Sequence, residues 1–192
     1  MAVLNGRLIA RAAAAGWIAL AALALPRDLA AQRSLEYEVK AAFLYNFVQF
    51  VEWPADTLPA GEPFRLCLAG ENPFGGVLER TVAGEQAAGR PIAVEVLAAD
   101  GAPSRCQVLF VPRSQASRTA ALLRATGAAA VLTVGESPRF LEVGGLINFV
   151  VEGGHVRFDI NADAATARDL RISSKLLRVA RTTGSSDRRE DR

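Results

Sequence analysis

The sequence has 192 residues, of which 51% are hydrophobic and 22% are charged, and its formal net charge is +2. That length corresponds to one domain, long enough to bury roughly 70% of the surface of its unfolded chain. The near balance of charge provides no extended basic surface, so we expect no nucleic-acid partner.

The first 31 residues have the features of a secretory signal peptide. Arg7 and Arg11 precede an apolar run over residues 12–25, and small residues around Ala31 follow as a cleavage site. The run is shorter than the roughly 20 residues of a membrane span, and an uncleaved anchor is the alternative. Cleavage would remove three arginines and one aspartate, which leaves a mature chain with equal numbers of basic and acidic residues.

The most informative stretch is an aromatic-rich segment over residues 38–54. At about 100° per residue, its apolar side chains fall on one broad arc, which predicts an amphipathic helix. These side chains are Phe43, Leu44, Phe47, Val48, Phe50 and Val51. Pro54 should end the helix, because proline disfavours helical backbone at the preceding Trp53. Lys40 points into the apolar arc, and we expect it to pair with an acid or to extend outward to solvent.

Cys67 and Cys106 are the only cysteines of the chain. In an oxidising compartment an even number of cysteines predicts a disulfide, which would stabilise the fold by roughly 4 kcal/mol on the chain-entropy model. Two buried thiols are the alternative, since free cysteine is a common core residue. Neither cysteine lies in a C-x-x-C motif, so a redox switch is less favoured.

Four runs predict strands: two of them, residues 106–111 and 129–134, are apolar enough to be buried strands of a parallel sheet, and the alternation of residues 92–96 marks a half-buried strand. The runs are residues 64–69, 92–96, 106–111 and 129–134. A short helix is expected from Val77 to Val82. Ser114 is the expected N-cap of a helix that reaches Arg124, which completes a right-handed strand–helix–strand unit.

The last third of the chain predicts a β-hairpin, with residues 146–151 and 155–161 flanking a Gly-Gly turn. A helix over residues 162–169 and a final helix through Ala180, capped by Ser173 or Ser174, should follow. Together these elements predict an α/β fold. It would be a single three-layer domain over residues 32–183, in which helices flank a mixed, mostly parallel sheet with a C-terminal antiparallel hairpin. Residues 184–192 are predicted to form a disordered tail.

No group of side chains predicts catalysis, metal binding or a cofactor. His155 is the only histidine and lies beside the hairpin turn, where we expect it to be exposed. Residues 70–76 stand where a phosphate loop would, but they lack its Lys-Ser/Thr pair and predict a turn. Ser173 precedes Lys175 by two positions, and a helix cap is favoured there over a catalytic dyad.

Four basic residues are predicted to form a stripe along the last helix: Arg171, Lys175, Arg178 and Arg181. A solvated face is the ordinary interpretation of such a pattern, and a docking surface for an acidic partner or anionic lipid headgroups is the alternative. The candidate partner-binding residues are the polar face of the hairpin and part of this stripe, namely Arg157, Asp159, Asn161, Arg171, Lys175 and Arg178.

The same segments resemble the YfiR family of exported bacterial proteins, formerly a domain of unknown function. The resemblance begins with a structural signature in the aromatic helix: Lys40, Phe43, Tyr45, Asn46, Phe47, Trp53 and Pro54. It continues through Cys67, residues 106–110, residues 144–149, residues 156–161 and residues 172–177. In order and spacing these blocks cover about residues 37–181.

The resemblance implies a periplasmic α/β protein, often a homodimer, without catalytic activity. The best-known member represses an inner-membrane diguanylate cyclase by binding its periplasmic region. An outer-membrane lipoprotein relieves that repression by capturing the repressor, so cyclic di-GMP rises under envelope stress. The present chain lacks a second cysteine pair of that member, and Asp169 stands where glycine is expected before Leu170.

We therefore predict a periplasmic regulatory binding protein that restrains an inner-membrane signalling protein such as a diguanylate cyclase, and thereby affects biofilm formation. The alternative is a periplasmic small-ligand-binding domain that serves a sensor kinase or a transporter. An enzyme is the third and weakest hypothesis, because only His155 and Ser173 could contribute to catalysis.

Overall fold

The computed structural model describes residues 25–98 and 101–181. The chain divides into two units, Met1–Glu36 and Tyr37–Arg192, and helix α2 (Leu25–Phe50) crosses the boundary between them. Most of the predicted signal peptide and the whole predicted tail lie outside the described residues, so both stay predictions. Among the described residues, no helix combines the length and the apolar character that crossing a membrane requires.

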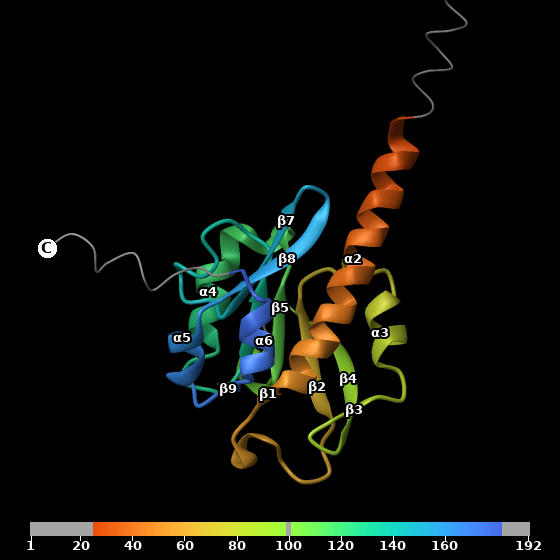
Figure 1. The fold of residues 1–192 in the computed structure, drawn as a ribbon. Coiled ribbons are helices and arrows are strands. Elements are labelled where there is room, and N and C mark those ends of the chain that lie inside the picture. Colours follow the sequence, from red (N-terminus) through yellow and green to blue (C-terminus); the bar gives the residue numbers. More distant parts are fainter. Residues whose placement is uncertain (1–24, 99–100, 182–192) are drawn as a thin grey trace, which may run out of the picture. The chain divides into compact units, whose positions relative to one another are not determined.

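A mixed sheet of seven strands forms the middle of the unit Tyr37–Arg192 (Figure 1). Its spatial order is β3-β4-β2-β5-β6-β7-β8, in which β4 to β7 run parallel and the two edge strands are antiparallel. The strands are β2 (Phe64–Ala69), β3 (Gln86–Ala87), β4 (Arg90–Leu97), β5 (Val108–Val111), β6 (Leu132–Gly135), β7 (Ile147–Glu152) and β8 (His155–Ile160). The predicted mixed sheet with a C-terminal hairpin is confirmed.

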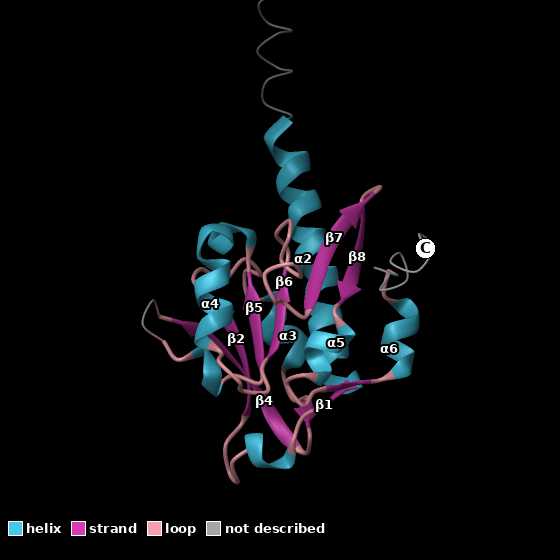
Figure 2. Cartoon of the chain, turned by 90° about the vertical axis from the view of Figure 1, so that its left-hand side faces the viewer, coloured by secondary structure: helices cyan, strands magenta, loops and turns pink. Residues whose placement is uncertain are grey.

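Helices cover both faces of this sheet because successive side chains of a strand point in opposite directions. On one face, Leu66 and Phe110 pack in the core cluster that contains Leu44 of α2. On the other face, Leu109 packs with Leu123 of α4. Figure 2 shows α4 on one side of the strands and α2 with α3 on the other. The helices after α2 are α3 (Val77–Val82), α4 (Thr119–Ala125), α5 (Ala162–Thr166) and α6 (Ser174–Val179). The predicted three-layer arrangement is thus confirmed.

The helix boundaries differ from the predictions at several points. α2 ends at Phe50, because the next two residues become the short strand β1 (Val51–Glu52) and pair antiparallel with β9 (Arg171–Ile172). The helix expected from Ser114 begins only at Thr119, after a 3₁₀ segment that starts at Arg113. The helix expected over residues 162–169 ends at Thr166. The expected strand over residues 129–134 begins only at Leu132.

A disulfide joins Cys67 of β2 to Cys106, which lies shortly before β5. The predicted pairing is therefore confirmed. Both residues are buried, and they pack in the cluster on the α4 face of the sheet. β2 and β5 are paired neighbours, so the bond connects two segments that the sheet already holds together. A buried disulfide of this kind fits an oxidising compartment such as the periplasm.

Replacing Cys67 and Cys106 together with alanine should lower the free energy of unfolding by about 2–4 kcal/mol, because the unfolded chain loses a crosslink. Urea denaturation followed by circular dichroism would measure this loss. The parent protein in dithiothreitol should unfold at the same lowered urea concentration as the double variant. Equal stability of the oxidised and the reduced parent would contradict a stabilising role for the disulfide.

Candidate functional site

A buried carboxylate at the end of β6 gathers polar groups from two other parts of the chain. Glu136 follows directly after Gly135, and its side chain is only 2% exposed. Its Oε2 forms an ion pair with Nζ of Lys40. Its Oε1 accepts hydrogen bonds from the Tyr37 hydroxyl at 2.9 Å and from the Arg113 backbone N–H at 2.8 Å. We call these four groups the Glu136 cluster, which joins α2 and the segment after β5 to the end of β6.

Lys40 is 1% exposed, a degree of burial that lysine rarely reaches. Its Nζ lies 4.7 Å from the centroid of the Tyr37 ring and 5.9 Å from that of the Phe149 ring. Aromatic faces attract a desolvated ammonium group by about 1–2 kcal/mol. The predicted pairing of Lys40 with an acid is confirmed. Sequence reasoning did not identify that acid as Glu136, because its only local signal is a position just after an apolar strand.

The cluster lies at the edge of the sheet where open α/β folds usually bind ligands. The parallel strands β2, β5 and β6 end on this edge. The strand order reverses between β2 and β5, since β4 lies on the far side of β2. Here the carboxylate of Glu136 already has a cation and two hydrogen-bond donors. The Glu136 cluster therefore acts as a structural lock that joins α2 and the segment after β5 to the end of β6.

Aromatic rings extend the contact between α2 and the hairpin. The rings of Phe43 and Phe47 lie 5.2 Å and 4.9 Å from that of Phe158, between centroids. Phe47 also stacks on Phe149 at 5.6 Å. Phe149 and Phe158 are opposite each other in the β7–β8 pairing. The two phenylalanines of α2 thus hold both strands of the hairpin.

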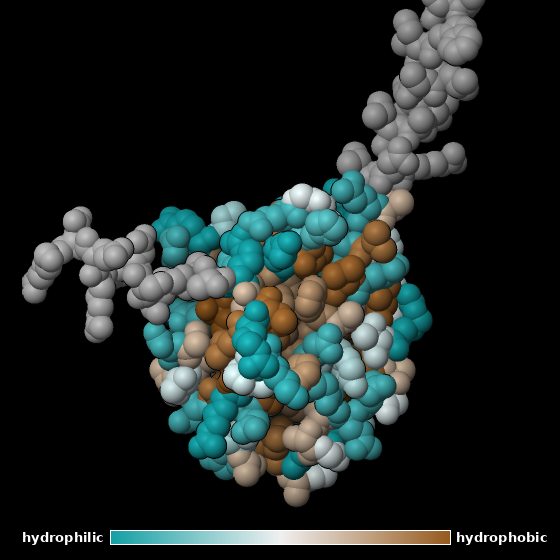
Figure 3. Space-filling view, in the orientation of Figure 1, coloured by the Kyte–Doolittle hydropathy of each residue, from teal (hydrophilic) through white to brown (hydrophobic). Residues whose placement is uncertain are grey.

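Apolar side chains remain exposed around this contact. Val39 of α2 is 38% exposed, Val151 of the hairpin 43% and Leu177 of α6 40%. Phe43 and Val156 are partly buried at the margin of the core. Figure 3 shows hydrophobic side chains gathered over α2 and β8, with hydrophobic and hydrophilic side chains mixed around α6. We call these five residues the α2–hairpin face. Contiguous apolar surface of this kind marks sites of protein interaction.

Ion pairs hold the C-terminal segment against β8. Arg181 donates to the carboxylate of Asp159 at 2.8 Å and 3.0 Å, and its backbone N–H donates to the Phe158 carbonyl at 2.8 Å. It also pairs with Glu152, from which Arg157 lies 3.9 Å away. The Asp159 side chain is 9% exposed and supports the fold, whereas the Arg157 side chain is 57% exposed.

The prediction of one basic stripe along the last helix is wrong. Ser173 accepts a hydrogen bond from the Lys175 backbone N–H and caps α6, so the helix begins after Arg171, and it ends before Arg181. Arg171 instead lies exposed in β9. Only Lys175 and Arg178 are exposed basic residues on α6 itself.

Asn161, another predicted partner-binding residue, has a structural task. Its Oδ1 accepts a hydrogen bond from the Ala164 N–H at 3.0 Å and so caps α5. The structure thus separates the predicted partner residues into one cap, one buried ion-paired aspartate and four exposed arginines and lysines. Their contact with a partner stays a prediction.

The other residues singled out in the sequence have local roles. His155 is exposed at the start of β8, as expected. Residues 70–76 form a turn, in which Asn72 Oδ1 accepts from the Phe74 N–H at 2.8 Å. Asp169 has a φ of 57°, in the left-handed region that favours the glycine expected there. The described part of the chain contains no group of three His, Cys, Asp or Glu residues that could hold a metal ion.

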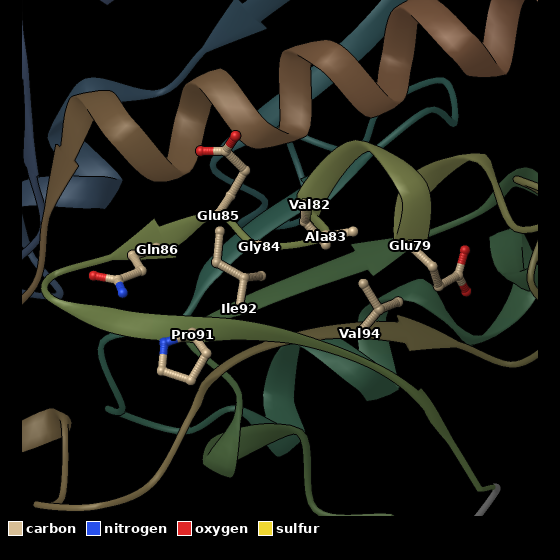
Figure 4. A pocket seen from close by; sticks show the side chains of 9 residues that line it. All are labelled: Glu79, Val82, Ala83, Gly84, Glu85, Gln86, Pro91, Ile92 and Val94. Carbon is tan, nitrogen blue, oxygen red and sulfur yellow. The ribbon is translucent and has the colours of Figure 1, made fainter.

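A pocket of about 230 Å³ lies between α3, the edge strand β3 and its neighbour β4 (Figure 4). Val82, Ile92 and Val94 line it with apolar surface, while Glu79 and Glu85 supply carboxylates. The Tyr45 hydroxyl donates to Glu85 Oε2 at 2.5 Å, and this hydrogen bond raises the pKa of Tyr45 above its ordinary value.

Comparisons with known proteins support the fold and the resemblance. A family model described as YfiR/HmsC-like matches residues 37–181. A crystal structure of a conserved domain protein from Vibrio cholerae O1 biovar El Tor superposes with a TM-score of 0.53 at 13% identity. The match covers 75% of this chain and 58% of that one, so the likeness concerns the fold and spans little more than half of the other protein. No curated protein matches.

Replacing Lys40 with alanine should lower the free energy of unfolding by about 3–5 kcal/mol, because it leaves the buried carboxylate of Glu136 without a cation. The pair Lys40→Met with Glu136→Gln should be clearly more stable than Lys40→Ala, since it buries no charge and still accepts from Tyr37 and Arg113. Chemical denaturation of the variants would measure both values.

Lys175, the only other lysine of the chain, provides the control. It is exposed on α6, so Lys175→Ala should change the free energy of unfolding by no more than about 0.5 kcal/mol. A Lys40→Ala variant as stable as Lys175→Ala would show that the ion pair does not hold the fold.

Proposed function

Because the chain belongs to the YfiR/HmsC-like family, we propose that it restrains an inner-membrane signalling protein, such as a diguanylate cyclase, from the periplasm. The family is one of regulatory rather than catalytic domains. The buried disulfide is consistent with a periplasmic location. The observation that carries the proposal is the α2–hairpin face, because it is an exposed apolar surface on a domain from a family of regulatory proteins.

The composition of this face supports docking of a protein. Val39, Val151 and Leu177 supply exposed apolar surface, as the centre of a protein interface requires. Lys175 and Arg178, the exposed basic residues of α6, add positive charge. We expect the partner to present an apolar segment with acidic neighbours, because complementary charge speeds association and selects the partner.

Contacts within the domain hold the α2–hairpin face in place, which favours regulation by a second protein that binds it. The Glu136 cluster holds α2 on the sheet and the Phe43–Phe158 contact holds it against the hairpin, so a partner would meet a preformed surface. An outer-membrane lipoprotein that bound the same face would compete with the signalling protein and relieve the restraint. A homodimer formed through the α2–hairpin face would also compete with the signalling protein and relieve the restraint.

Deletion of the gene should raise cellular cyclic di-GMP and biofilm formation, and the parent gene should restore both. Val151→Asp should fail to restore them, because it places a charge in the apolar centre of the face. Mass spectrometry of extracted nucleotides would measure cyclic di-GMP.

Val143→Asp is the matched control, since Val143 and Val151 are both 43% exposed and Val143 lies in the loop between β6 and β7. It should restore the parent level. Unchanged cyclic di-GMP on deletion would refute restraint of a cyclase, and full restoration by Val151→Asp would refute docking through this face.

A pocket beside Trp53 favours a second candidate, a small-ligand-binding domain. It measures about 750 Å³, and its lining includes Trp53, Arg171 and the two carboxylates of Glu52 and Asp169. An aromatic side chain together with charges of both signs suits a small ligand that carries both an anionic and a cationic group. A metabolite screen by thermal shift would support this function if one compound raised the melting temperature saturably in the parent and not in Arg171→Ala.

A further inference from the structure

One edge of the seven-stranded sheet is open over most of its length. β3 pairs with β4 only through Gln86↔Pro91 and Ala87↔Arg90. The Ile92 N–H also bonds on this side, to the Glu85 carbonyl at 3.3 Å. The backbone N–H and C=O groups of every second residue point to the same side of a strand. Because Ile92 directs its N–H to this edge, Val94 and Val96 direct their backbone groups there too. Within the described residues, no strand pairs with β4 there.

Natural proteins usually protect an exposed strand edge by a charge, a proline or a bulge. Pro91 gives that protection only at the start of β4, next to β3. Val96, farther along, is 54% exposed, and Glu95 is paired with Arg65. The opposite edge of the sheet differs, because the backbone of Arg181 bonds to β8. The open edge of β4 is therefore able to accept an added strand.

The 230 Å³ pocket lies along this same edge. Ile92 and Val94 of β4 line it together with Val82 of α3. Figure 4 shows Val82, Ile92 and Val94 between the two glutamates Glu85 and Glu79, whose side chains extend from separate segments. The pocket is thus apolar inside and carries negative charge on two sides. No arginine or lysine is among its lining residues.

We propose that the β4 edge binds an extended peptide segment of a partner protein, in which lysine or arginine residues alternate with apolar residues. The segment would pair with the backbone of β4 beyond Pro91. Its side chains on the α3 side would lie over the pocket, where their aliphatic stems contact Ile92 and Val94 and their charges meet Glu79 and Glu85.

Charge complementarity favours such a partner over a second copy of the chain. Two β4 edges brought together would offer each pocket the apolar side chains Ile92, Val94 and Val96. They would leave the glutamates of both copies without a cation. This site goes beyond the proposed function, because it lies on β3–β4 and shares no residue with the α2–hairpin face.

The test uses protein expressed from its full-length gene and a capped, fluorescein-labelled peptide of alternating lysine and valine. Fluorescence anisotropy should show saturable binding. N-methylation of one alternating set of peptide amides should weaken binding by at least about tenfold, because several strand hydrogen bonds are lost together. N-methylation of the other set should leave binding unchanged. Equal effects of the two sets, or no binding by the parent protein, would overturn the proposal.

Charge reversal tests the pocket. Glu79→Lys should weaken binding of the lysine peptide and improve binding of a glutamate–valine peptide. Glu142→Lys, an equal charge change in the loop between β6 and β7, should do neither. Val151→Asp should bind the peptide like the parent, so failure of this site and failure of the proposed function are distinguishable. Concentration-dependent dimers that Val96→Asp abolishes and Val151→Asp does not would assign the edge to a second copy and overturn the proposal.

Discussion

The burial of one carboxylate organises this domain. Glu136 is almost inaccessible to water, and a buried carboxylate is tolerated only when charge and hydrogen bonds compensate for lost hydration. Lys40 supplies the charge, while Tyr37 and the backbone of Arg113 supply the hydrogen bonds. Tyr37 and Lys40 lie three positions apart on α2, and Arg113 follows β5. The placement of α2 on the sheet therefore pairs both buried charges of the cluster.

That constraint connects the core to the surface on which the proposed function depends. With α2 fixed by Lys40, the next turn of the helix carries Phe43 onto the hairpin, and Val39 remains exposed beside it. The hairpin in turn is held by Phe47 and by the ion pairs of Arg181. The exposed apolar residues thus sit on a rigid frame, which limits the entropy that a partner must overcome on binding.

The sequence predicted most helices and strands well, because each of them depends on the spacing of residues that are close together in the chain. The period of α2, the buried runs of β2 and β5 and the Gly-Gly hairpin follow from side-chain geometry alone. The partner of Lys40 could not be identified, since Glu136 lies 96 positions away and carries no motif of its own. The prediction of a basic stripe failed for a similar reason: Arg181 is engaged by Asp159, a tertiary contact, and the cap at Ser173 starts α6 only after Arg171. The pocket beside β4 depends on how α3 packs against the strand edge, and no local pattern in the sequence predicts that packing.

The Glu136 cluster locks α2 to the sheet. Hydrogen–deuterium exchange of Glu136→Gln and parent protein tests it most directly, with peptides covering α2 and β5 followed separately. In the variant, exchange should be faster in α2 from Tyr37 to Phe50 and in the hairpin, while β2 and β5 stay protected. Unchanged exchange in α2, or an equal increase throughout the sheet, would contradict a lock that acts between this helix and the sheet.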